Sequence, residues 1–281
     1  MAQIRIDPLT GQRAIVADAT GGAVLPLLEP ESPAPPATAD PDLFWSGAAR
    51  GAHELIELAR APVRSLAELD EAAVTAALER CRERMRAHAG AACLHLAVDE
   101  GDGPPTAQLF ALDFVPSGIA RERERFGAYA TRTMGGNLLA DLVQNEVRLR
   151  DRIVAIDREA VLMAPFGSRA PYQLLLAPRV PRTRFEDEGP TGALLLREGL
   201  ARLARVLGEP PPLSLWVRTA PSGAEHFCWR IDVLPRLDGG VGVAGAAGGA
   251  GAPGLQGLAL GTGLGVALMA PETAAAQLRE A

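Results

Sequence analysis

The stretch from Glu100 to Pro116, EGDGPPTAQLFALDFVP, carries residues whose types and spacing could bind a phosphate. A glycine-rich turn comes first, Thr106 and Gln108 follow it, and an apolar strand then runs to Pro116. Backbone N–H groups of such turns, with nearby hydroxyl and amide groups, are typical donors to phosphate oxygens. The pattern therefore predicts a phosphate-binding loop, but it does not indicate which reaction the loop serves.

Residues for other kinds of chemistry are scattered. The chain has four histidines, at His53, His88, His95 and His226. None is spaced as HxH or HxxH, so no local metal motif is present. No Ser, Thr, Cys or His stands in a recognisable nucleophile–base motif. His95 alternates with Leu94 and Leu96, so we expect it on the opposite side of a strand, in a structural or surface role.

Composition excludes several classes of function. The 281 residues are 48% hydrophobic and 22% charged, which indicates a soluble globular protein. A net charge of −6 offers no cationic surface for nucleic acid or anionic lipid. All 28 cationic side chains are arginines, which favours bidentate binding of phosphate or carboxylate and excludes lysine chemistry. Three separated cysteines and a charged N-terminal segment predict a cytoplasmic protein without a signal peptide.

One uncharged stretch is long enough to raise the question of a membrane span. It runs from Gly239 to Pro271 and consists mainly of glycine and alanine, interrupted by Pro253 and Gln256. This composition predicts a flexible loop that leads into a strand, rather than a spanning helix.

The elements that would position these residues follow an α+β pattern. Residues 4–18 predict a hairpin, and the proline-rich residues 29–42 predict an exposed linker. A strand at 53–58 precedes a helix that begins at a capping box formed by Ser65 and Glu68. The expected elements after it are strands at 92–98 and 108–116, helices capped by Ser117 and Asn137, and strands at 152–157, 160–165 and 172–178.

The order helix, strand, loop, strand ending in proline occurs twice, about 120 residues apart. The second copy comprises a helix at 192–207, a strand at 213–218 and a strand at 228–237. The repeat predicts two related α+β halves, an N-terminal one at 1–135 and a C-terminal one at 136–281. The glycine- and alanine-rich loop at about 239–257 falls in the second half.

Several ordered motifs resemble those of galactose-1-phosphate uridylyltransferases, a family of the histidine-triad superfamily. RIDPLTGQRAIVA is similar to the family's opening, ARGAHELIE to its G-x-H-E-V strand, and AQLFALDFVP to the segment that carries H-x-H-x-Q. FCWRIDVLPRL resembles the F-H-W-H-I-E-I-L-P-R-L segment near the family's end. The resemblance implies two tandem histidine-triad-like halves with antiparallel sheet and flanking helices. It also implies a role in galactose metabolism, in which UMP passes from UDP-glucose to galactose 1-phosphate through a uridylyl-histidine intermediate.

The residues at the family's catalytic positions differ. The two histidines of H-x-H-x-Q fall on Pro104 and Thr106, so Thr106 stands at the position of the nucleophile, while Gln108 is kept. The family's asparagine before the glycine-rich turn is Asp99, which would bring a negative charge near a diphosphate. We expect Gln108, Asp99 and Arg50 to contact any bound substrate.

The family's metal ligands are also replaced. The C-x-x-C pair falls on Asn137 and Ala140, and the histidines of F-H-W-H fall on Cys228 and Arg230. The resemblance therefore implies a divergent member with no zinc or iron site and no cofactor.

Three hypotheses for function stay open. The first is a degenerate homologue, or pseudoenzyme, that still binds a UDP-sugar or a hexose 1-phosphate. The second is an active nucleotidyltransferase with rearranged catalytic groups. The third is a structural or regulatory subunit that pairs with an active paralogue. The family implies a homodimer, or a heterodimer with such a paralogue, and no nucleic-acid or membrane partner.

Overall fold

The computed structural model describes most of the chain. The described residues are 3–6, 13–16, 24–25, 27–29, 32, 46–60, 63–101, 103–237 and 262–281. The predicted loop at 239–257 lies outside them, and so does nearly all of the predicted linker at 29–42.

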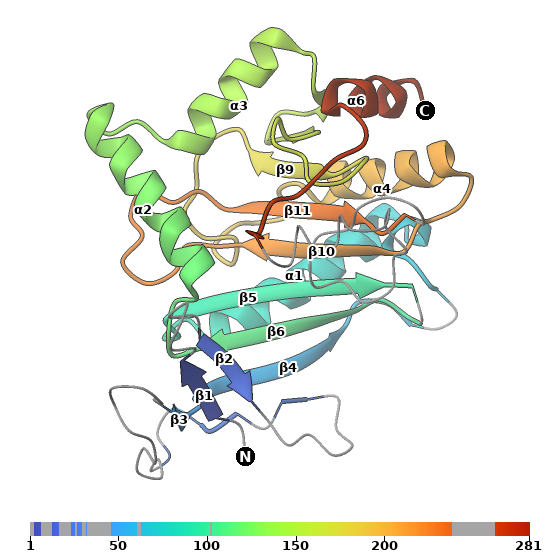
Figure 1. The fold of residues 1–281 in the computed structure, drawn as a ribbon. Helices are drawn as coiled ribbons and strands as arrows, with labels where there is room; N and C mark the ends of the chain where they lie inside the picture. The colour runs from blue at the N-terminus through green and yellow to red at the C-terminus, as the bar shows by residue number, and fades with distance from the viewer. Residues whose placement is uncertain are drawn as a thin grey trace.

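An eight-stranded sheet forms the centre of the protein (Figure 1). Its strands lie in the order β4-β6-β5-β10-β11-β9-β8-β7, and every pair in it is antiparallel. The strands are β4 (Gly51–Glu57), β5 (Cys93–Glu100), β6 (Thr106–Leu112), β7 (Ile153–Ile156), β8 (Ala160–Met163), β9 (Leu174–Pro178), β10 (Leu213–Arg218) and β11 (Arg230–Pro235).

The predicted repeat is confirmed in the order of the strands. Helix α1 (Glu71–Ala87) leads into the hairpin β5–β6, and helix α4 (Ala193–Leu207) leads into the hairpin β10–β11. Strand β4 flanks β6 in one set, and β9 flanks β11 in the other. The two sets meet where β5 pairs with β10, so both halves contribute to one continuous sheet.

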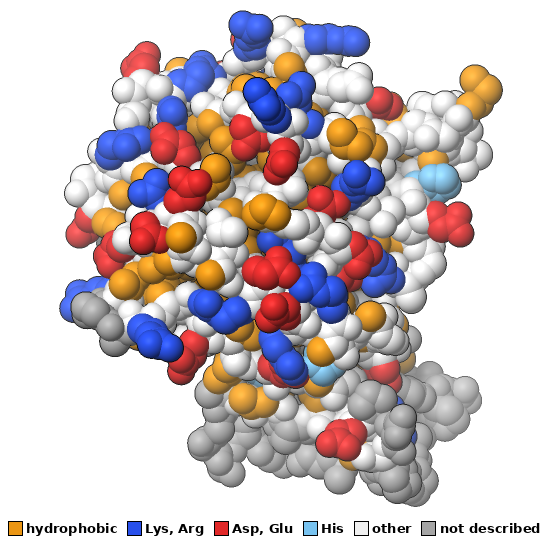
Figure 2. All heavy atoms as spheres, turned by 180° about the vertical axis from the view of Figure 1, so that it is seen from behind, with side chains coloured by type: hydrophobic (Ala, Val, Ile, Leu, Met, Phe, Trp, Pro, Cys, Tyr) orange, Lys and Arg blue, Asp and Glu red, His pale blue; other side chains and the backbone are white. Residues whose placement is uncertain are grey.

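Each set buries one face of its strands under its own helix. Leu96 and Leu109 from the first set and Val217 and Ile231 from the second are at most 1% exposed, in a core cluster shared with α1, α4 and α6 (Pro271–Glu280). Figure 1 shows α1 and α4 behind the sheet. Seen from behind, arginine and carboxylate side chains are interspersed over the surface, as Figure 2 shows. This face offers no broad field of one sign.

The opposite face is covered only in part. Helix α3 (Leu138–Leu149) and the buried Phe126 of α2 (Ser117–Arg132) pack there against residues that include Val161, Met163 and Leu175. Near the other end, a small sheet in the order β2-β1-β3 is formed by β1 (Gln3–Ile6), β2 (Arg13–Val16) and β3 (Ser46–Ala48). The pairing of β1 with β2 confirms the predicted hairpin.

Helix caps agree with the sequence in one case and differ in two. Asn137 caps α3, because its side chain accepts a hydrogen bond from the N–H of Ala140. The expected cap at Ser117 is wrong: Pro116 is the N-cap of α2, and Ser117 already lies inside the helix, where no side-chain cap forms.

The expected capping box is also corrected. Ser65 caps only a short 3-10 turn, η1 (Leu66–Glu68), and the backbone N–H of Arg64, rather than that of Ser65, donates to Glu68. Helix α1 begins separately, after Asp70, whose side chain accepts from the N–H of Ala73. None of the helices in the described part of the chain has the length and apolar character needed to cross a membrane.

Candidate functional site

Three of the four predicted site residues share the face of the sheet that α1 and α4 leave uncovered, which we call the open face. Gln108 on β6 lies opposite Leu55 on β4 and Ala97 on β5, and Thr106 lies opposite Glu57. Residues directly opposite each other, and those two apart on one strand, point to the same side. Asp99, two residues beyond Ala97, therefore lies on the open face with Gln108 and Thr106.

The second half adds aromatic and polar groups to this face. Trp216 on β10 lies opposite Ala97, and Ser214 lies opposite Asp99. The guanidinium of Arg169 lies 6.0 Å from the ring of Trp216. Trp216 and Ser214 are not among the residues predicted for the site, although the alternation in LSLWVR gives the signal. Leu213, Leu215 and Val217 are buried, so the residues between them face outward.

The charge of Asp99 is compensated. Its carboxylate accepts a hydrogen bond from Ser214 Oγ at 2.5 Å and lies 3.3 Å from the guanidinium of Arg236. Arg236 also donates to the backbone carbonyl of Glu100. Asp99 is thus held between the two halves by groups that neutralise part of its charge.

Thr106 is engaged locally. Its hydroxyl donates to the carbonyl oxygen of Pro104 at 3.2 Å. Among the described residues no imidazole, carboxylate or amine hydrogen-bonds to this hydroxyl, so nothing there would take its proton. A threonine without a base is a weak nucleophile.

Arg50 lies apart from the other three residues. It directly precedes Gly51, at the opposite end of β4 from Glu57, the partner of Thr106. Arg50 and Glu57 are seven positions apart along the strand, which is roughly 23 Å at about 3.3 Å per residue. The guanidinium of Arg50 donates to the carbonyl of Glu29 at 3.3 Å.

Two histidines lie on the open face beside Phe110. His53 is stacked on the Phe110 ring at 4.2 Å, and its Nδ1 accepts a hydrogen bond from the N–H of Leu25. In the neutral ring the proton therefore lies on Nε2. Burial lowers the pKa of His53, and the neighbouring Gln108 side chain opposes part of this effect. These contacts give His53 a structural role.

His95 lies opposite Phe110 on one side and Arg218 on the other. Leu94 and Leu96 point into the core, so His95 faces the other way, as predicted. Burial and the charge of Arg218 lower the pKa of His95 to about 4. Its imidazole is therefore neutral at pH 7.

The side chains at the family's metal-ligand positions do not fit a metal. Asn137 caps α3 through its side-chain oxygen and donates its amide to the carbonyl of His226. Ala140 offers no side-chain ligand atom, and Cys228 is a buried thiol whose pKa burial raises to about 11, so it is protonated at neutral pH. Arg230 is a cation that hydrogen-bonds to Glu122 and Asp232. Within the described ranges, no group of three or more His, Cys, Asp or Glu side chains could hold a metal ion.

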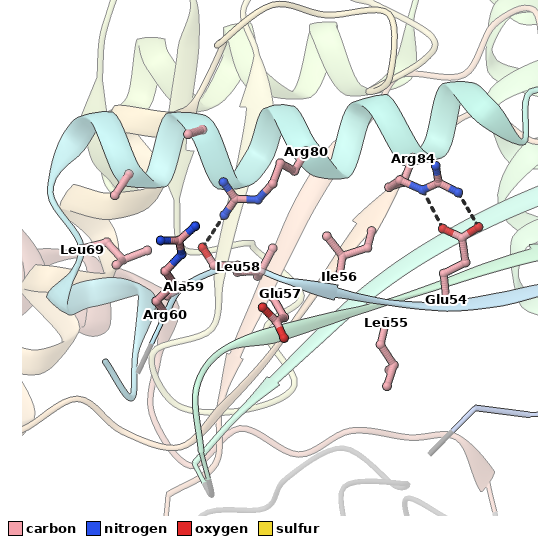
Figure 3. A pocket seen from close by; sticks show the side chains of 12 residues that line it. Glu54, Leu55, Ile56, Glu57, Leu58, Ala59, Arg60, Leu69, Arg80 and Arg84 are labelled. Atoms are coloured by element: carbon pink, nitrogen blue, oxygen red, sulfur yellow. Dashed lines mark hydrogen bonds and ion pairs between the residues drawn. The ribbon is translucent and has the colours of Figure 1, made fainter. Parts of the chain in front are cut away.

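A hollow of about 610 Å³ lies at the sheet edge, between β4 and α1 (Figure 3), and none of the four predicted site residues lines it. Arg84 forms two hydrogen bonds with Glu54, at 2.8 and 2.7 Å, and Arg80 donates to the carbonyl of Leu58 at 2.7 Å. Because these two arginines are already bound within the protein, the hollow offers less positive charge to an anionic ligand than its composition indicates.

The fold and the open face together define a class: an α+β protein of two similar halves that share one antiparallel sheet, with a polar face that spans their junction. No family model matches the chain. The chain is 25% identical over 218 residues to the galactose-1-phosphate uridylyltransferase of Haemophilus influenzae, covering 73% of this chain and 61% of that protein. It is 30% identical over 123 residues to the enzyme of the same name from Cryptococcus neoformans, covering 42% of this chain and 32% of that protein.

Solved structures share the fold over greater lengths. One described as the structure of uridylyltransferase has a TM-score of 0.80 at 22% identity and covers 99% of this chain and 97% of its own. An ADP-glucose phosphorylase from Arabidopsis thaliana with bound ADP-glucose has a TM-score of 0.67 at 20% identity and covers 83% of this chain and 74% of its own. The chain is therefore similar in sequence to galactose-1-phosphate uridylyltransferases over part of their length, and it shares the fold of the solved uridylyltransferase. The chain spans about three fifths of the length of its Haemophilus influenzae relative.

Proposed function

We propose that this protein binds a nucleotide sugar or a hexose 1-phosphate on the open face, and that the family's ordinary covalent route is lost. The observation that carries the proposal is the position of Gln108 on the open face of the first half, on the same side of the sheet as Thr106 and Asp99. Its amide can donate to a phosphoryl oxygen. The names of the sequence relatives support this class of ligand.

The loss of the ordinary route rests on Thr106. Removal of a covalent nucleophile typically costs on the order of 10⁴- to 10⁶-fold in turnover. The Thr106 hydroxyl donates to Pro104, and that bond does not activate it. Asp99 bears a negative charge, but its contacts with Ser214 and Arg236 reduce the repulsion that a diphosphate would meet.

Calorimetry with UDP-glucose, UMP and galactose 1-phosphate tests the proposal. We expect heat with at least one ligand, and about a tenfold loss of affinity in Gln108→Ala, since one hydrogen bond to a charged group contributes about 1.5 kcal/mol. Gln144→Ala, an exposed glutamine on α3, is the matched control and should bind like the wild type. If none of the three ligands produces heat, the binding proposal fails.

A specific observation also favours the second hypothesis, an active nucleotidyltransferase with rearranged groups. His95 is a neutral imidazole on the same face as Gln108. His53 is a poorer candidate nucleophile, because its Nδ1 lone pair is occupied by the N–H of Leu25. In such a reaction a His95 nitrogen would form a bond to the α-phosphorus. The bond from that phosphorus to the bridging oxygen would break, and the hexose 1-phosphate would leave with the electron pair.

Retention of radiolabel separates this hypothesis from simple binding. Wild-type protein would be incubated with UDP-glucose labelled in the uridine, denatured and washed. Label that persists in wild type and in His226→Gln, but not in His95→Gln, would support a covalent role for His95. Wild-type protein that retains no label, and exchanges none between UDP-glucose and glucose 1-phosphate, would rule it out.

A further inference from the structure

Four charged side chains join α2 to the two central strands of the second half. Glu122 of α2 hydrogen-bonds to Arg230 of β11 and lies 3.6 Å from Arg218 of β10. Asp232, two residues beyond Arg230, accepts a hydrogen bond from it at 3.1 Å. Arg218 and Arg230 lie directly opposite each other on the open face. We call these four residues the charge cluster.

The charge cluster is largely buried and electrically balanced. Its side chains are between 7% and 25% exposed. Two guanidinium groups face two carboxylates, so no net charge is left in a region of low dielectric. Burial disfavours the charge of Arg230, but Asp232 and Glu122 outweigh this effect and raise the pKa of Arg230. Arg230 therefore stays a cation throughout the physiological range of pH.

Position 230 is where the family resemblance implies a histidine that binds a metal. A guanidinium has no lone pair to give to a metal ion. It is a cation itself, and its planar fork of donors suits carboxylate oxygens. The carboxylates that contact Arg230 come from a helix and from a strand, so the guanidinium connects two elements, as a structural metal does.

We infer that Arg230 replaces a metal ion as the cation that ties α2 to the sheet, and that folding of this protein requires no bound metal. Helix α2 also contacts the sheet layer through Ile119, which packs with Cys93 and Leu112, and through Phe126, which stacks on Phe227 at 4.8 Å. Glu122 lies between these apolar contacts. The charge cluster thus fixes the middle of α2 against strands β10 and β11. This inference does not depend on the proposed function.

Metal content and chelation test the first part of the inference on the wild-type protein. Protein purified without added metal would be assayed for zinc and iron by mass spectrometry and melted with and without EDTA. We expect far less than one metal ion per chain and the same melting temperature in both buffers. One equivalent of zinc or iron, or a lower melting temperature in EDTA, would overturn the inference.

Substitution of Glu122 tests the role of the charge cluster. Glu122→Gln keeps the shape of the side chain but leaves two buried guanidinium groups with one carboxylate. We expect a melting temperature lower by on the order of 5 to 10 °C, with or without EDTA. Glu124→Gln, an exposed carboxylate on the same helix, should change it by no more than about 1 °C. If both variants melt alike, the charge cluster does not hold α2 and the inference fails. If Glu122→Gln does not fold, the metal and chelator measurements on wild type still decide its first part.

Discussion

Glu100 anchors the loop that leads to Thr106 and Gln108, and its removal should be costly. The side chain is 2% exposed, and its two oxygens accept hydrogen bonds from the hydroxyl of Ser65 and the N–H of Leu66, both at 2.8 Å. Glu100→Ala would leave both buried donors without a partner. Each such donor costs about 1–3 kcal/mol, so we expect a loss of about 3 kcal/mol in the free energy of unfolding.

Glu100→Gln separates hydrogen bonding from charge. The amide oxygen can still accept from Leu66, and the amide nitrogen can donate to the Ser65 oxygen, so we expect a loss of no more than about 1 kcal/mol at neutral pH. Burial raises the pKa of Glu100 above its usual 4.5. Because the folded-state pKa is the higher one, folding favours the protonated form. The wild type should therefore gain stability as pH falls through that raised pKa towards 4.5, and Glu100→Gln should lack this gain.

Urea unfolding of wild type and both variants, at several pH values between 4.5 and 8, measures these effects. Glu83→Ala, an exposed carboxylate on α1, is the matched control and should lie within about 0.5 kcal/mol of the wild type. The reasoning is refuted if Glu100→Ala is as stable as this control, or if the difference between wild type and Glu100→Gln does not change with pH.

Three further predictions concern packing, an ion pair and the thiols. Gly51→Ala should cost more than about 3 kcal/mol, because φ is +136° and the new Cβ would lie 2.0 Å from the carbonyl oxygen of Ala111. Gly127→Ala, in open space on α2, should instead raise stability by about 0.5–1 kcal/mol, and thermal unfolding of both variants checks the contrast. Arg84 lowers the pKa of Glu54 to about 2, so the stability that this ion pair contributes above pH 4.5 should be lost as the pH falls from 4.5 to 2. Solvent screening limits this contribution to about 1 kcal/mol. If wild type and Glu54→Gln lose the same stability over this pH range, the prediction is contradicted. Burial raises the pKa of each of the three thiols, to about 12 for Cys81 and about 11 for Cys93 and Cys228. Iodoacetamide at pH 8 should therefore label these cysteines only after the protein is denatured. Mass spectrometry of the native protein would detect any cysteine that is labelled earlier.

Local patterns predicted the elements well because they depend on neighbouring residues. Alternation identified the strands of both halves, and the side chain of Asn137 identified the start of α3. The capping box at Ser65 was predicted wrongly for a tertiary reason. The Ser65 hydroxyl donates to Glu100, 35 positions away, and also accepts from Ala67 within a single 3-10 turn. Nothing in the local sequence shows that partner.

The site was predictable along one strand but not across strands. Thr106 and Gln108 share a face because they are two residues apart, which the sequence shows directly. The partner of Asp99, Arg236, lies 137 positions away and reaches it only because β5 pairs with β10. Arg50 was grouped with the site from its place in the chain. Since β4 runs antiparallel to β6, Arg50 lies at the far end of the pair from Thr106.

The alternation of side chains along each strand separates the helix-facing core from the residues of the open face. Ala107 and Leu109, which flank Gln108, are fully buried under the first half's helix, and Ile231 beside Arg230 is fully buried under the second. The side chains of Thr106 and Arg230 point to the other side of the sheet. A substitution on this side of a strand therefore leaves the helix-facing core unchanged and alters the contacts of the open face. On this account, substitutions at positions 106 and 108 should affect ligand binding far more than stability. Arg230 differs from positions 106 and 108, because the charge cluster makes it part of the structure that holds α2.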